Sequence, residues 1–171
     1  MNQNPNPVQV NLIQQKLSLD SQFKSGVNWF FWIAGLSLVN SVIYLAGGSL
    51  NFVVGLGATQ FIDGLVSGVA QELGGGMIVR VLGFGLDLVV AGIFVGFGIL
   101  ARKKQRWAVF LGMIVYVLDG LIFLAVGEFL AVIFHAWALY GLWRGQQAMQ
   151  ALQAFEASNA PSEPAATFAS D

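Results

Sequence analysis

Long apolar runs separated by short polar breaks dominate the hydrophobic pattern of this chain. Three runs are long enough to cross the ~30 Å hydrocarbon core of a bilayer as helices, at ~1.5 Å per residue. A fourth run is shorter by about one turn. We therefore predict an all-α integral membrane protein, an antiparallel bundle of four transmembrane helices at residues 27–46, 78–100, 107–126 and 128–143.

The connection between the first two predicted spans has a different pattern. In residues 59–73 apolar side chains recur at helical spacing, and polar side chains such as Gln60 and Asp63 occupy the other side. This periodicity predicts an amphipathic helix that lies at the membrane interface or re-enters the bilayer. A fifth span at residues 51–70 is the alternative, which the glycines and Asp63 of that stretch disfavour.

Both ends of the chain are more polar than the middle. Residues 1–26 mix polar side chains with apolar ones at helical spacing, so we predict a short interfacial helix before the first span. A cleaved signal peptide is disfavoured, because the polar lead and the apolar run after it are both too long. Residues 145–171 are predicted to continue the last helix at first and to be disordered from Ser158 onward, where Ala, Ser and Pro dominate.

Basic residues are unevenly distributed around the predicted spans. With four spans, the two termini and the loop after the second span share one side of the membrane. That side holds Lys16, Lys24, Arg102, Lys103, Lys104, Arg106 and Arg144, whereas the other side holds only Arg80. The positive-inside rule therefore places both termini in the cytoplasm, and a bacterial inner membrane is the default location. The cluster from Arg102 to Arg106 sets this topology, with binding of anionic lipid headgroups as a second role.

Composition supports a membrane protein and excludes several kinds of site. The chain is 56% hydrophobic and only 10% charged, whereas a soluble domain has roughly a quarter of charged residues. Cysteine is absent and His135 is the only histidine, so disulfides, thiolate sites and a multi-histidine metal site within one chain are excluded. Since no basic patch exists outside the loop cluster, we expect no nucleic-acid partner, no metal and no cofactor.

Ionisable residues inside predicted spans are functional candidates, because their insertion into hydrocarbon costs ~3 kcal/mol or more. Counted from the non-cytoplasmic ends of their spans, Asn40, Asp87, Asp119 and His135 lie at similar depths of about 9 to 13 Å. We predict that they form one polar layer, in which His135 shares a proton with Asp87 or Asp119. The peripheral candidates are Arg80, Glu128 and Asp63.

Two functions from different classes remain open. We favour a small accessory or scaffold subunit that packs in the lipid bilayer with itself, as a homo-oligomer, or with a larger membrane complex. The alternative is a transporter or channel component that moves protons, cations or a small solute through the polar layer. The apolar half of the bundle below the layer disfavours that alternative, because no complete pathway is visible in the sequence.

Two further patterns bear on this choice. Pairs of glycines four residues apart, at 64 and 68, 92 and 96, and 141 and 145, are typical of closely packed membrane helices. An intramembrane hydrolase could combine Ser37 or Ser41 with His135 and an aspartate, but no nucleophile elbow or oxyanion motif accompanies them. We therefore expect no enzymatic activity.

Overall fold

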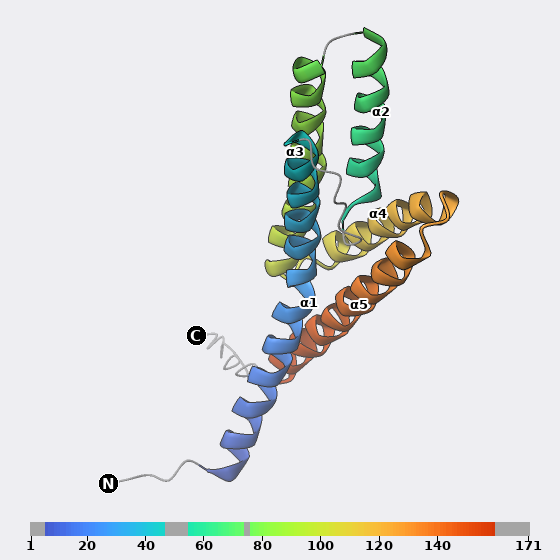
Figure 1. The fold of residues 1–171 in the computed structure, drawn as a ribbon. Helices are drawn as coiled ribbons and strands as arrows, with labels where there is room; N and C mark the ends of the chain where they lie inside the picture. The colour runs from blue at the N-terminus through green and yellow to red at the C-terminus, as the bar shows by residue number, and fades with distance from the viewer. Residues whose placement is uncertain (1–5, 47–54, 74–75, 160–171) are drawn as a thin grey trace, which may run out of the picture.

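The computed structural model describes residues 6–46, 55–73 and 76–159, and the regular structure in these residues is entirely helical. The helices are α1 (Pro7–Leu45), α2 (Gly57–Leu73), α3 (Gly76–Arg102), α4 (Arg106–Ala125) and α5 (Phe129–Ser158) (Figure 1). The all-α prediction is confirmed. The predicted disorder of residues 160–171 lies outside the described residues.

Three of these helices, α1, α3 and α4, are long and apolar enough to cross a membrane. The last helix does not reach that standard, because its apolar part ends at Arg144, fifteen residues after the helix begins, and a span needs about twenty. Four spans are therefore not shown. The alternative fifth span is not among the candidates either: its described part belongs to α2, which has 17 residues, and residues 51–54 lie outside the described residues.

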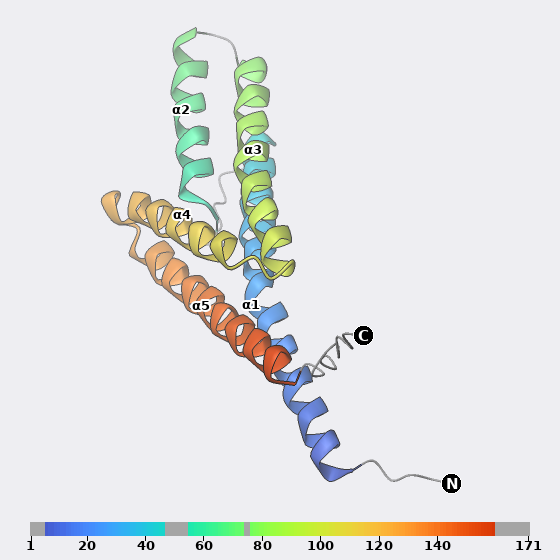
Figure 2. The same cartoon turned by 180° about the vertical axis from the view of Figure 1, so that it is seen from behind.

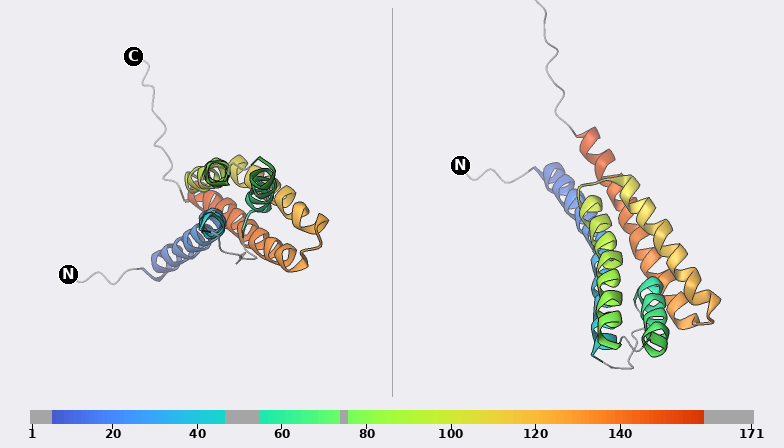
Figure 3. Two further views of the ribbon diagram at one scale, coloured as in Figure 1. Left: turned by 45° about the horizontal axis from the view of Figure 1, so that its top comes forward. Right: turned by 90° about the horizontal axis from the view of Figure 1, so that it is seen from above.

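The helices form two splayed pairs with α2 between them. α1 and α3 run antiparallel, while the hairpin of α4 and α5 diverges from them, and α2 stands beside α3 above α4 (Figures 1 and 2). The start of α1, the turn between α3 and α4 and the end of α5 lie at one end of the molecule (Figure 3). The basic residues of that turn therefore lie at the same end as the start of α1 and the end of α5.

The first helix is continuous from the polar end of the chain into the first span. It has 39 residues, so no break separates the helix predicted in residues 1–26 from the span predicted at 27–46. Asn6 caps it by accepting a hydrogen bond from the Val8 N–H at 3.1 Å, and Pro7 occupies its first turn, where a missing N–H has no consequence.

Glycine allows α1 and α5 to cross at close range. A Cβ placed on Gly145 would lie 2.7 Å from the Cα of Gly26, which leaves no space for a side chain at the crossing. The Trp29 ring of α1 also packs against Gly141. Gly141 and Gly145 therefore serve packing between α1 and α5 of the same chain, not packing against another protein.

Aromatic rings fill the bundle between this crossing and the centre. Phe94 lies 6.4 Å from Phe30, 6.1 Å from Phe97 and 5.9 Å from Tyr116, measured between ring centroids. Phe30, Phe94 and Tyr116 are at most 2% exposed. Aromatic rings therefore form the core between the crossing and the centre of the bundle.

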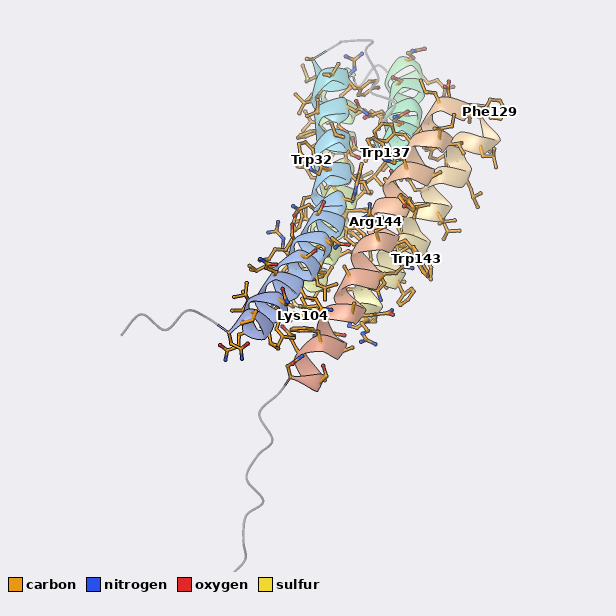
Figure 4. The ribbon with its side chains drawn as sticks, turned by 90° about the horizontal axis from the view of Figure 1, so that it is seen from below. Trp32, Lys104, Phe129, Trp137, Trp143 and Arg144 are labelled. Carbon is orange, nitrogen blue, oxygen red and sulfur yellow. The ribbon has the colours of Figure 1, made fainter. Side chains whose placement is uncertain are left out.

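Large apolar side chains cover the outer surface of the bundle. Trp32 of α1 and Phe129, Trp137 and Trp143 of α5 are 45–68% exposed (Figure 4). A surface so rich in apolar and aromatic groups is typical of contact with lipid rather than water, and it extends over α5 as well as over the three apolar helices.

Candidate functional site

The N-terminus of α2 begins inside the bundle, not at its surface. Leu56, directly before the helix, is 0% exposed, and Gly57 and Thr59 are buried. The Leu56 N–H donates to the Ser37 hydroxyl of α1 at 2.7 Å, and the Thr59 hydroxyl donates to the Leu56 carbonyl at 2.8 Å. These bonds satisfy buried backbone groups that would otherwise lack a partner.

Asp119 of α4 caps this helix end from a distant part of the chain. Its two carboxylate oxygens accept hydrogen bonds from the Gly57 and Ala58 N–H groups, each at 2.8 Å. The unpaired N–H groups give a helix N-terminus a partial positive charge, so a carboxylate is the group best suited to this position. Asp119 therefore holds α2 in place as well as balancing its own buried charge.

His135 of α5 completes the cluster. Its Nε2 atom lies 3.0 Å from the Asp119 Oδ2 atom, and its Nδ1 atom lies 2.9 Å from the Ala131 carbonyl oxygen. The ring stacks on Tyr116, with centroids 4.3 Å apart. The two ring nitrogens thus join the Asp119 carboxyl group to the backbone of α5.

Asp87 of α3 lies in a separate polar cluster. It is 0% exposed, and neither of its carboxylate oxygens has a hydrogen-bond partner among the described residues. Its polar neighbours are Ser41 of α1 and Asp63 of α2, but the Ser41 hydroxyl donates to the Ser37 carbonyl at 3.2 Å instead. Asp63 is 8% exposed. Two carboxyl groups so close together in a buried site can hold a proton or a cation between them.

A second group of polar side chains lies one to two helical turns outward from this pair. The Tyr44 hydroxyl hydrogen-bonds to the Ser67 hydroxyl, and the Arg80 guanidinium lies 5.9 Å from the centroid of the Tyr44 ring. The Arg80 Nε atom is buried and has no hydrogen-bond partner in the described part of the chain. Helices α1, α2 and α3 thus share polar groups from Asp87 towards the α2–α3 end of the bundle.

The predicted polar layer is therefore divided between two places. Asp119 and His135 are in direct contact, whereas Asp87 makes no hydrogen bond with either of them. Asn40 is buried beside the entry to α2, where a Cβ on Gly55 would lie 2.5 Å from its amide nitrogen. Glu128 is exposed in the turn before α5.

Sequence reasoning missed the groups that join these residues. Spacing places Ser37 on one face of α1 with Asn40 and Tyr44 but does not identify its partner, and the backbone N–H groups of Gly57 and Ala58 carry no side-chain signal. Asp119 and Gly57 are 62 residues apart, so no local capping pattern could connect them. The short polar residues on the inner face of α1 were the available hint.

The basic cluster after α3 contacts the middle of α1 and the end of α5. Lys104 Nζ lies 2.6 Å from Glu156 Oε2, Arg106 donates to Gln153 at 2.6 Å, and Arg102 donates to Asn28 at 2.8 Å. Lys103 is exposed. The hydrogen bond from Lys104 lowers the pKa of Glu156 below its ordinary value, so this pair stays charged in mildly acidic solution.

The capping role of Asp119 can be tested by hydrogen exchange. Asp119→Ala removes the acceptor of two buried N–H groups, and each unsatisfied group costs roughly 1–3 kcal/mol. We expect amide exchange at residues 57–60 to accelerate by on the order of tenfold or more, while α3 keeps its protection. Asp20→Asn, a change at a half-buried aspartate of α1 that pairs with Lys24 and lies outside this cluster, is the control. Unchanged exchange at 57–60 in Asp119→Ala would show that the carboxylate does not hold α2.

Comparison with known proteins gives no guide to what this arrangement does. The chain matches no protein-family model, no curated protein and no solved structure. Function must therefore be argued from the geometry of the chain itself.

Proposed function

We propose that α1, α3, α4 and the first half of α5 cross a bacterial inner membrane, with both termini in the cytoplasm. Three of these helices have the length and hydropathy of spans. In α5 the exposed aromatic residues Phe129, Trp137 and Tyr140 support a lipid-facing position. The start of α1, the basic turn and the end of α5 lie at one end of the molecule, which supports the orientation (Figure 3).

Within this arrangement α2 is a re-entrant half-helix. Its N-terminus lies beside Ser37 and Asp119, near the middle of the bundle, and its C-terminus lies near the start of α3 (Figure 1). Backbone that ends at membrane depth is tolerated only where protein groups satisfy it. Here the backbone N–H groups of Leu56, Gly57 and Ala58 are satisfied by the side chains of Ser37 and Asp119.

The function that the geometry supports best is that of an accessory or scaffold subunit that packs in the bilayer with itself or with a larger membrane complex. One observation carries this proposal. A Cβ on Gly85, Gly92 or Gly96 of α3 would meet nothing within 4 Å, whereas Gly83 and Gly98 of the same helix are packed against Val66 and Phe31. The outward small-residue face lets the backbone of another helix approach closely.

The scaffold proposal predicts that large side chains at this face disrupt assembly without disrupting the fold. In Gly92→Leu and Gly96→Leu the added side chains point into space that the chain leaves open. We expect association of labelled copies in liposomes, or co-purification with a membrane partner, to weaken by on the order of tenfold, equivalent to ~1.4 kcal/mol.

Gly35→Leu is the matched control, because Gly35 of α1 is equally open. It should leave assembly unchanged, and all three variants should keep the melting temperature of the isolated protein. Assembly that is the same in wild type, Gly92→Leu and Gly96→Leu would contradict the proposal.

A transporter or channel component is the second candidate, and the carboxyl pair of Asp63 and Asp87 favours it. Both acids are buried, and the Asp87 oxygens have no hydrogen-bond partner among the described residues; such acids are costly in a membrane and commonly mark proton or ion pathways. Polar groups on α1, α2 and α3 would supply access from the α2–α3 end. Towards the other end the aromatic cluster of Phe30, Phe94 and Tyr116 would have to open.

Flux measurements separate this candidate from the scaffold. A transporter requires that reconstituted wild-type protein move protons or monovalent cations faster than protein-free liposomes do, and that Asp87→Asn abolish this movement while the fold is kept. Asp20→Asn near the start of α1, outside the polar clusters, should leave flux unchanged. No wild-type flux, or equal flux in wild type and Asp87→Asn, would leave only the scaffold.

A further inference from the structure

An apolar groove lies between α2 and the end of α4 and begins at the capped end of α2. Its volume is about 640 Å³, which is within the range of pockets that bind small organic molecules. One wall is formed by Phe61, Leu65 and Val69 of α2. The other wall is formed by Ile122 and Phe123 of α4 and by Val126, which caps the C-terminus of α4. The groove therefore offers an elongated apolar surface on both sides.

The chain does not fill this groove with its own side chains. Gly64 and Gly68 line it at successive turns of α2, and a Cβ on either glycine would meet nothing within 4 Å. Phe61 and Leu65 are 59% and 55% exposed. At the closed end, a Cβ on Gly57 would lie 2.9 Å from the Phe123 ring. The groove is thus hollow along α2 and closed where α2 is capped.

The charged side chains that line the groove are both negative. Glu72 lies on the wall formed by α2 and Glu128 on the opposite wall, in the turn before α5. Gln60 is neutral, and none of the described residues that line the groove is basic. Because opposite charges attract most strongly beside a low-dielectric surface, the two carboxylates favour a cation in their vicinity.

From this complementarity we propose that the groove binds a single-chain cationic amphiphile, with its alkyl chain between α2 and α4 and its amine or quaternary ammonium group attracted by the negative charge that Glu72 and Glu128 give to the groove. A diacyl phospholipid fits less well, because the described lining offers no cationic side chain for its phosphate. This binding site is independent of the packing face on α3 and of the aspartate pair.

Binding can be measured by titrating the protein, held in phosphatidylcholine nanodiscs, with dodecyltrimethylammonium, and subtracting the heat of empty nanodiscs. The matched ligand is dodecyl sulfate, which has the same chain and the opposite charge. We expect the cation to bind on the order of tenfold more tightly than the anion, and Glu72→Gln combined with Glu128→Gln to remove this preference.

Filling the groove supplies a second, independent test. Gly64→Leu places a side chain in the hollow without a clash and should abolish binding of both ligands. Gly35→Leu on α1 should change nothing, and both variants should keep the wild-type melting temperature. Equal affinity for cation and anion in the wild type would overturn the proposal. Binding that survives Gly64→Leu, or a diacyl phospholipid that native mass spectrometry shows retained and undisplaced by the cation, would also overturn it.

Discussion

A helix that starts within a membrane bundle leaves N–H groups that water cannot reach, and each unsatisfied group costs several kcal/mol in a lipid environment. In this chain the carboxylate of Asp119 accepts two of these groups, and the Ser37 hydroxyl accepts the Leu56 N–H just before them. His135 pairs with the same carboxylate and is itself held by the Ala131 carbonyl and the stacked Tyr116 ring. The position of α2 depends on this cluster, which joins α1, α4 and α5 to one helix end.

Once its N-terminus is held, α2 presents different groups to its two sides. Asp63 is a charged neighbour of Asp87 of α3, and the small residues Gly64 and Gly68 line the groove towards α4. A rotation of α2 about its axis would separate the two aspartates and change the shape of the groove together. The proposed ion pathway and the proposed amphiphile site therefore share a structural dependence on Asp119, although neither requires the other.

Much of the fold could be predicted from the hydrophobic pattern. Periodicity located the helix at 59–73, which the structure extends to 57–73, and run length located three apolar helices. Depth along a helix, however, does not determine which way a side chain faces or how the helices diverge. Similar depths predict Asp87 and Asp119 in one layer. In the structure, Asp87 has its polar neighbours on α1 and α2. Asp119 instead contacts the first residue of α2 and His135 of α5. Contacts between residues about 60 positions apart have no local signature.

The depth of α2 in the bilayer tests the central claim most directly. The chain has no cysteine, so spin labels can be attached at single cysteines introduced at Phe61, Leu65 and Val69, which lie on one exposed face of α2. Power saturation with oxygen and a nickel chelate then reports the depth of each label in liposomes. A re-entrant half-helix predicts that the label at position 61 is deepest and the label at 69 shallowest, separated by up to ~12 Å at ~1.5 Å per residue. Equal depths at all three positions would mean that α2 lies flat on the membrane surface, and would contradict the account.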